Sequence, residues 1–166
     1  RIIEIGFGMG HTTAEIAETL SDSNFIAIDV HSPGVGNLLN KIKEKNLKNL
    51  KIIQHDAVEV LEKMTLDESI DAIHIFFPDP WHKKRHNKRR LIQQTFLELI
   101  SRKLKKEGYI HIATDWEDYA NWIIEIFKNN SMYKAKNIDF SKKPSYRPKT
   151  KYENRWVNLG HQVWDM

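Results

Sequence analysis

The segment Ile2-Ile3-Glu4-Ile5-Gly6-Phe7-Gly8-Met9-Gly10 decides how the rest of this chain is interpreted. Its apolar beginning predicts a buried strand over residues 2–6, and the apolar spacing over residues 12–20 predicts a helix soon after it. Glycines between a strand and a helix let the backbone approach a ligand closely at the carboxyl end of the strand. Because residue 11 is His11, the spacing is G-x-G-x-G and differs from the G-x-G-x-x-G pattern of dinucleotide-binding loops.

Strand-like and helix-like patterns alternate along the rest of the chain. We expect further strands over residues 24–29, 50–54, 70–77 and 108–113, and further helices over residues 35–45, 57–64, 88–103 and 119–128. This alternation is typical of a doubly wound α/β fold with a mostly parallel sheet. Residues 141–151 are expected to form a loop, and residues 152–166 one or two terminal strands antiparallel to the others. One domain over residues 1–166 follows.

The composition excludes several classes of protein. With 40% hydrophobic and 29% charged residues, the chain has the make-up of a globular domain. We expect no membrane helix, because no apolar run approaches the roughly 18 residues that a span requires. We expect no signal peptide either, because the opening residues 1–6 have the pattern of a core strand. Cysteine is absent and the eight His are scattered without ligand spacing, so we expect no disulfide and no metal site, in keeping with a cytoplasmic protein.

Charge is divided unevenly along the chain. Residues 1–81 contain 7 Lys and Arg against 13 Asp and Glu, whereas residues 82–166 contain 19 against 9, and the formal net charge is +4. A strongly basic second half favours a polyanionic partner such as a nucleic acid. A basic surface that is only solvated is the alternative.

The glycine loop together with its preceding acid, from Glu4 to Gly10, matches the E-x-G-x-G-x-G first motif of S-adenosylmethionine-dependent methyltransferases. Two further acids stand at expected strand ends. Asp29 closes the second strand, placed to accept hydrogen bonds from a ribose diol, and Asp56 follows the third, where it would meet an adenine amino group. The alternative is a tight turn, with acids that merely begin helices.

The fourth expected strand ends in Phe76-Phe77-Pro78-Asp79-Pro80-Trp81. The prolines fix their own φ angles and Pro80 also restricts Asp79, so this carboxylate is held rigidly at the end of a strand. Such a carboxylate can accept hydrogen bonds from the N1–H and the N2 amino group of guanine, which lie side by side. Alternatively, Asp79 only caps the turn that follows.

A basic segment comes next: His82-Lys83-Lys84-Arg85-His86-Asn87-Lys88-Arg89-Arg90, in which six of nine residues are Lys or Arg. Exposed cations at this density neutralise phosphates, and the position beside Asp79 favours nucleic-acid binding. A solvated loop is the alternative, and a nuclear-localisation signal would need a eukaryotic context that the sequence does not show.

Five motifs in order resemble the bacterial tRNA (guanine-N7-)-methyltransferases of the TrmB type. Two are the segments from Glu4 to Gly10 and from Phe77 to Arg90. The others are His31-Ser32-Pro33-Gly34-Val35-Gly36, Ala113-Thr114-Asp115-Trp116, and Arg147-Pro148 with Thr150-Lys151-Tyr152-Glu153-Asn154-Arg155. The resemblance covers the whole chain with one departure, because the family usually has Gly after Arg155 and this chain has Trp156. The family also has an N-terminal segment before these motifs.

The resemblance implies a class I methyltransferase with a Rossmann-like sheet, S-adenosylmethionine as methyl donor, and tRNA as partner. It assigns catalysis to Asp79. The cofactor pocket would contain Glu4, Gly6, Gly8, Gly10, Asp29, Asp56 and Asp79. Substrate contacts would come from Lys83, Asp115, Thr150, Lys151, Tyr152 and Glu153. Contacts to tRNA would come from Arg85, His86, Asn87, Lys88, Arg89 and Arg90.

The implied reaction is methyl transfer to N7 of the guanosine at position 46 in the tRNA variable loop. N7 carries an unprotonated lone pair, so proximity and orientation are sufficient and no Cys or His nucleophile is needed. One alternative is methylation of an exocyclic amine of another nucleic acid or of a protein. Such enzymes commonly carry D/N-P-P-Y/F/W at this strand end, where this chain has Pro78-Asp79-Pro80-Trp81. The other is an RNA-binding module with an inactive cofactor site. A monomer and a homodimer both stay open.

Overall fold

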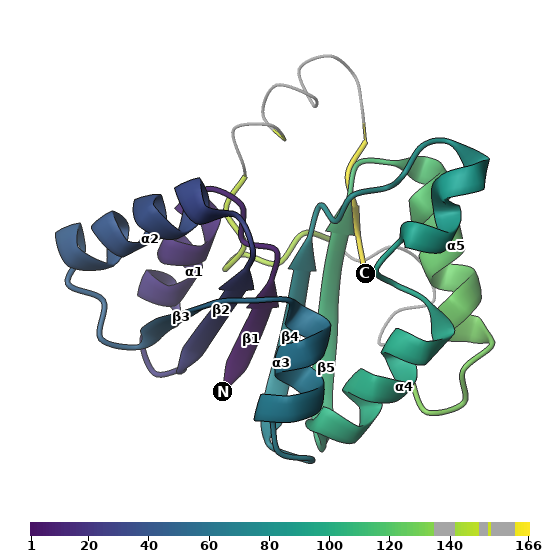
Figure 1. Ribbon diagram of the computed structural model, residues 1–166, viewed down its shortest axis with the longest axis horizontal. Coiled ribbons are helices and arrows are strands. Elements are labelled where there is room, and N and C mark those ends of the chain that lie inside the picture. Colours follow the sequence, from purple (N-terminus) through teal and green to yellow (C-terminus); the bar gives the residue numbers. More distant parts are fainter. Residues whose placement is uncertain (135–141, 150–152, 154–161) are drawn as a thin grey trace.

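The computed structural model describes residues 1–134, 142–149, 153 and 162–166. Through these residues runs one sheet in the strand order β3-β2-β1-β4-β5-β6 (Figure 1). The strands are β1 (Ile2–Ile5), β2 (Phe25–Asp29), β3 (Leu50–Gln54), β4 (Ile70–Phe76), β5 (Leu104–Thr114) and β6 (Trp164–Asp165). The first five run parallel and β6 pairs antiparallel with β5. The predicted doubly wound, mostly parallel sheet with an antiparallel terminal strand is confirmed.

Helices cover both faces of the sheet, with α1 and α2 on one face and α3, α4 and α5 on the other (Figure 1). Their bounds are α1 (His11–Thr19), α2 (Ser32–Glu44), α3 (Ala57–Met64), α4 (Gln94–Lys103) and α5 (Glu117–Lys128), with a 3₁₀ helix, η1 (Lys84–Arg89), between β4 and α4. None of the helices in the described ranges is long and apolar enough to cross a bilayer.

The strands are apolar on both sides because they fill two cores. Along β1, Ile3 and Ile5 pack under α3, α4 and α5, whereas Ile2 packs under α1 and α2. Along β4, Ile73 faces the first of these cores and Phe76 the second. Successive side chains of a strand point to opposite faces, so a near-continuous apolar run is what a strand covered on both sides requires.

The direction of the chain reverses between β1 and β4. From β1 the chain moves outward through β2 to β3, and it then returns to β4 on the other side of β1 and continues to β5. In doubly wound sheets ligands bind at this switch point, outside the carboxyl ends of the strands. The glycine loop begins at the end of β1 and the Asp79 loop begins at the end of β4, so both lie at this switch point.

The expected helix over residues 88–103 is wrong in its first part, because α4 begins only at Gln94. The backbone before it is engaged by side chains of α5. Ile92 N donates to Tyr119 Oη at 3.2 Å, and the indole of Trp122 donates to Ile92 O at 2.9 Å. These tertiary hydrogen bonds take the place of the helical ones.

Other boundaries differ by a few residues. The strand expected at residue 108 begins at Leu104, since the polar Lys105-Lys106-Glu107 hid its first half and its pairing with β4 is irregular between Ile70 and Ala72. The helix expected at residue 35 begins at Ser32, because a proline in the first turn lacks only a donor that would stay unpaired there. In the terminal region the described part contains a strand at Trp164–Asp165, and most of residues 152–166 lie outside the described ranges.

Candidate active site

The loop after β1 places three glycines in the left-handed region, with φ of 76° at Gly6, 56° at Gly8 and 72° at Gly10. Residues with a Cβ rarely adopt this conformation. No atom lies within 4 Å of the place a Cβ would take at Gly6 or Gly8, whereas at Gly10 it would stand 2.7 Å from Leu38 Cβ on α2. Gly10 is therefore packed against α2, whereas at Gly6 and Gly8 the side toward which a Cβ would point is open and a ligand can meet the backbone there.

Asp29, at the end of β2, braces this loop. Its Oδ2 accepts a hydrogen bond from Gly8 N at 2.7 Å, and its Oδ1 accepts one from His31 N at 2.9 Å. A carboxylate oxygen has two lone pairs, so each oxygen of this half-buried group keeps one for a further donor such as a hydroxyl.

Asp56 stands at the end of β3 and begins α3. Its Oδ1 accepts a hydrogen bond from Glu59 N at 3.0 Å, the geometry of an N-cap, and its side chain is exposed. Helix capping therefore accounts for one of its oxygens, and contact with an adenine amino group stays a prediction.

Glu4 lies on β1, on the side of α1, and only 3% of its surface is exposed. Its Oε1 accepts a hydrogen bond from Thr13 Oγ1 at 3.1 Å, whereas its buried Oε2 has no hydrogen-bond partner among the described residues. Burial raises the pKa of Glu4 to about 7; the Thr13 hydrogen bond opposes this and the charge of Asp29 adds to it. An unpartnered buried carboxylate oxygen is costly until a donor reaches it. Glu4 thus calls for a polar ligand beside the open glycines.

The loop after β4 is strained on both sides of Asp79. Phe77 and Trp81 have φ of 52° and 47°, unusual values for bulky residues that are typical of functional sites. Phe77 N donates to Ala113 O on β5 at 2.7 Å, and Trp81 N donates to Asp79 Oδ1 at 3.0 Å. The capping interpretation therefore holds for one oxygen. The carboxylate is exposed and keeps its remaining lone pairs for a ligand.

An aromatic contact joins the loops after β4 and β5. The ring of His82 lies 4.2 Å from the ring of Trp116, edge to face. Trp116 N donates to Thr114 Oγ1 at 3.3 Å and immediately precedes α5. Asp115, half-buried, stands between these two residues in sequence. The structure thus brings the Asp115 loop against the loop that carries Asp79, as their predicted roles require.

The basic segment is largely exposed around η1. Lys83 precedes η1 and is exposed, and Arg89 stacks its guanidinium on Trp81 with 5.0 Å to the ring centroid. His86 and Asn87 are half-buried. The exposed members are Lys83, Lys84, Arg85, Lys88 and Arg89.

Arg90 departs from the expectation that it meets tRNA, because it is only 2% exposed. Its Nε donates to Pro80 O at 2.9 Å and its Nη2 to Asp118 at 2.5 Å. The guanidinium lies over the rings of Tyr119 and Trp122, at 4.8 and 5.1 Å from their centroids. Arg90 therefore connects the Asp79 loop, through Pro80 O, to Asp118 on α5, and its buried guanidinium is not placed to neutralise a phosphate.

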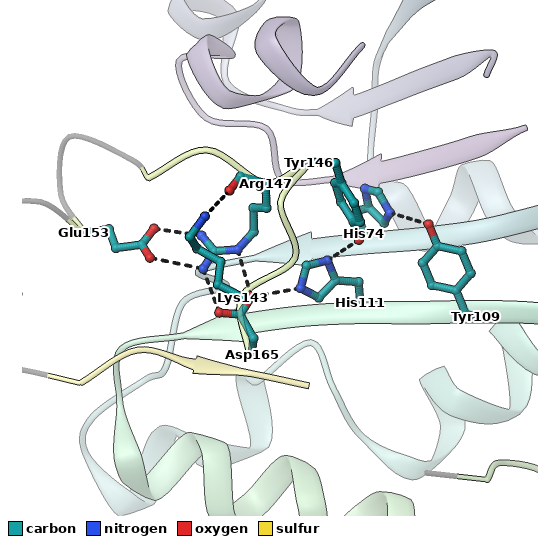
Figure 2. A network of polar contacts seen from close by, with 8 residues as sticks. All are labelled: His74, Tyr109, His111, Lys143, Tyr146, Arg147, Glu153 and Asp165. Atoms are coloured by element: carbon teal, nitrogen blue, oxygen red, sulfur yellow. Dashed lines mark hydrogen bonds and ion pairs between the residues drawn. The ribbon is translucent and has the colours of Figure 1, made fainter. Parts of the chain in front are cut away.

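Glu153 is also buried, with 4% of its surface exposed. Both of its carboxylate oxygens accept from the guanidinium of Arg147, at 2.8 and 3.1 Å (Figure 2). This pairing engages both oxygens, and the substrate contact that the resemblance implies for Glu153 stays a prediction. The other members of the late motif, Thr150, Lys151 and Tyr152, lie outside the described residues.

Comparisons with known proteins agree with this geometry. A family model described as "Putative methyltransferase" matches residues 1–166. A tRNA (guanine-N(7)-)-methyltransferase of Methylobacillus flagellatus is 54% identical over 166 residues, which is 100% of this chain and 70% of that protein. A protein of the same description from Chromobacterium violaceum is 55% identical over 100% of this chain and 74% of its own length.

The chain belongs to the tRNA (guanine-N7-)-methyltransferase family. Solved structures of other methyltransferases share its fold at lower identity. A precorrin-6y C5,15-methyltransferase of Geobacter metallireducens aligns with a TM-score of 0.60 at 17% identity, over 77% of this chain and 61% of that one. A SAM-dependent O-methyltransferase of Thermotoga maritima aligns with a TM-score of 0.57 at 19% identity, over 78% and 43%. The class I methyltransferase fold that the motifs implied is confirmed.

Sequence reasoning missed several buried polar residues of this tRNA (guanine-N7-)-methyltransferase family member. His74 and His111 lie side by side on β4 and β5, and Asp165 on β6 accepts from His111 Nε2 at 2.9 Å. No motif marks them, although the strand alternation places both histidines on the same face. Within the described ranges, no group of three or more His, Cys, Asp or Glu could hold a metal ion.

Proposed function

We propose that this methyltransferase transfers a methyl group from S-adenosylmethionine to N7 of a guanosine in tRNA, at position 46 of the variable loop. The observation that carries the proposal is the meeting of two loops at the switch point. The glycine loop leaves β1, the strained Asp79 loop leaves β4, and these strands are direct neighbours in the sheet. Membership of the family supports the same acceptor and the same partner.

The residues around β1 fit S-adenosylmethionine. Open space faces Gly6 and Gly8, which suits close approach to the backbone. The buried oxygen of Glu4 offers an acceptor to an ammonium group, and Asp29 keeps lone pairs for the ribose hydroxyls. The chemistry that S-adenosylmethionine supplies when bound is a methyl group on a positively charged sulfur.

Asp79 has the role of orienting guanine. The left-handed residues Phe77 and Trp81 fix the loop on both sides, so its carboxylate is preorganised to accept from N1–H and the N2 amino group. N7 has no proton to lose, so no base is needed, and orientation alone can contribute an effective molarity of about 10⁵ M or more. We assign Lys83 and Asp115, which lie in the two loops joined by His82 and Trp116, to the same substrate.

The exposed cations around η1 serve to bind the tRNA backbone. Lys84, Arg85, Lys88 and Arg89 follow the Asp79 loop directly, so phosphates held there bring the target base to the switch point. Phosphate contacts position a nucleic acid without reading its sequence. Selection of guanine is then left to Asp79 and its neighbours.

The test is single-turnover methylation of unmodified tRNA by the wild type and by Asp79→Asn. The amide keeps the shape but presents a donor where guanine presents donors, so we expect a loss of at least about a hundredfold. The matched control is Asp22→Asn, which changes an exposed carboxylate in the turn before β2 and should leave the rate unchanged. At saturating S-adenosylmethionine the wild-type rate should not climb tenfold per pH unit, because N7 has no proton for a base to remove.

Two results would contradict the proposal. A folded Asp79→Asn protein with a near-normal rate would remove the assignment of this residue. A wild-type rate that climbs tenfold per pH unit would indicate that a proton is removed from the acceptor, as an amine requires.

A further inference from the structure

The segment that carries Arg147 packs on the face of β4 and β5 where His74 and His111 lie (Figure 2). The ring of Tyr146 stacks on His74 with 5.5 Å between centroids and 13° between planes. Its hydroxyl bonds to His111 Nδ1 at 2.6 Å. Lys143 Nζ closes the turn by donating to Arg147 O at 2.6 Å. These contacts hold residues 143–147 against the sheet.

Arg147 is fully buried, and its guanidinium donates hydrogen bonds to two carboxylates. Its Nε and Nη2 donate to Asp165 at 2.8 and 2.7 Å, and its Nη1 and Nη2 donate to Glu153 at 2.8 and 3.1 Å (Figure 2). Paired N–H groups of one guanidinium thus meet each carboxylate in the bidentate geometry that fixes direction as well as distance. Lys cannot reproduce this geometry.

Both ring nitrogens of His111 are engaged by residues of other segments. Asp165 Oδ1 can only accept, so His111 Nε2 carries a proton and donates to it at 2.9 Å. His111 Nδ1 lies 2.6 Å from the Tyr146 hydroxyl, so both ring nitrogens of this buried imidazole have a hydrogen-bond partner. Burial by itself would raise the pKa of Asp165, but the hydrogen bonds from His111 and Arg147 outweigh it and hold that pKa below its usual value.

Arg147 also reaches the strained start of the Asp79 loop. Its guanidinium carbon lies 5.8 Å from the ring centroid of Phe76 and 5.8 Å from that of Phe77. One buried cation therefore contacts the end of β4, the terminal strand through Asp165, and the side chain of Glu153.

We propose that Arg147 is a positioning residue for methyl transfer, and that Glu153 acts through Arg147 rather than by touching guanine. This inference rests on the proposed function. Both Glu153 oxygens already accept from the guanidinium, and the side chain is 4% exposed. Through Arg147 the start of the Asp79 loop, the terminal strand and Glu153 are held in one arrangement, and a shift of about 1 Å in such an arrangement can cost about a hundredfold in rate.

The test compares tRNA that has guanosine at the target position with tRNA that has inosine there, which lacks the N2 amino group. The wild type, Glu153→Gln, Arg147→Lys and the double variant are assayed in single turnover at saturating S-adenosylmethionine. We expect each single variant to lose about a hundredfold with both substrates, so that the guanosine-to-inosine rate ratio stays within twofold of the wild type. The double variant should be no slower than the slower single variant, since the two residues act as a unit.

Affinity measurements separate positioning from loss of the fold. Cofactor affinity, measured by calorimetry, and tRNA affinity should each stay within about threefold of the wild type. The described side-chain contacts of Arg147 lie with Phe76, Phe77, Glu153 and Asp165, outside the glycine loop and η1. The matched control is Arg102→Lys, an exposed arginine in the last turn of α4, which should keep the full rate. If Arg147→Lys does not fold, Glu153→Gln still decides, because it removes a charge and leaves an acceptor of the same shape.

Three outcomes would overturn the inference while leaving the proposed function intact. They are a Glu153→Gln rate ratio that collapses toward one, which would put Glu153 on the guanine edge; losses that multiply in the double variant; and folded single variants with the wild-type rate. A wild type that methylates neither tRNA would instead overturn the proposed function.

Discussion

Replacing Glu4 by Gln should stabilise the protein at high pH. Burial of this carboxyl raises its pKa from 4.5 to about 7, so the folded state holds the proton more tightly than the unfolded chain does. The stabilising contribution of that proton is fully present below pH 4.5 and is lost as the pH rises through 7. Above pH 7 the folded state carries an ionised, buried group whose shift of roughly 2.5 pKa units corresponds to about 3 kcal/mol.

Glutamine carries no such charge, keeps the shape, and can still accept from Thr13. In urea unfolding, Glu4→Gln should exceed the wild type by about 3 kcal/mol in the free energy of unfolding at pH 8.5, and by close to zero at pH 4. Taking the difference between the two proteins removes every other titrating group. The matched control is Glu62→Gln, an exposed carboxylate on α3, whose difference should not change with pH.

A difference that is the same at both pH values would refute the reasoning, and so would a variant less stable than the wild type at pH 8.5. The stabilised variant should bind S-adenosylmethionine more weakly, because we assign the unpartnered Oε2 as the acceptor for an ammonium group of the cofactor. Gain of stability with loss of affinity is the usual relation at a binding site.

Three further predictions concern residues with other roles. Burial, followed by the charge of His111, lowers the pKa of His74 to about 3. The neutral ring's contribution to the free energy of unfolding is therefore fully present above pH 6.5 and falls as the pH drops, so between pH 7.5 and 5 the wild type should lose about 2 kcal/mol more than His74→Phe in urea unfolding. Equal losses would contradict the burial argument. Arg90→Lys should lower the methylation rate and the unfolding midpoint while leaving tRNA affinity unchanged in filter binding; a selective loss of tRNA affinity would return Arg90 to the RNA surface. Replacing Arg85, Lys88 and Arg89 together by Glu should abolish tRNA binding without changing the cofactor affinity measured by calorimetry. Loss of both affinities would indicate that η1 has a structural role instead.

Local pattern was sufficient for much of the fold. The strand at 50–54 and the helix at 57–64 have the predicted bounds, because apolar periodicity and an N-cap acid at Asp56 are local signals. The expected helix start at residue 88 is wrong because Tyr119 and Trp122, about thirty residues later in the chain, take the backbone hydrogen bonds of Ile92. A local stretch of sequence around residue 88 does not include these side chains, so its pattern cannot predict that they take hydrogen bonds from the helix.

The site divides in the same way. The glycine spacing and the prolines around Asp79 predict tight loops from local sequence alone. The structure has positive φ angles at the three glycines, and also at Phe77 and Trp81. Arg89 and Arg90 are adjacent and chemically identical, yet Arg89 is exposed and Arg90 is buried. Only folding brings Asp118 and the aromatic rings of α5 next to Arg90. The contact of His111 with Asp165 spans 54 residues and follows from strand pairing, not from a motif.

The most direct measurement uses a tRNA transcript in which 7-deazaguanosine replaces the guanosine at position 46. This base keeps the N1–H and N2 donors that we assign to Asp79 but has a C–H group in place of the N7 lone pair. The transcript should bind with the affinity of the unmodified tRNA and should accept no methyl group, while the guanosine transcript accepts one per molecule at N7. Methyl transfer to the 7-deazaguanosine transcript at the normal rate would contradict N7 of this guanosine as the acceptor.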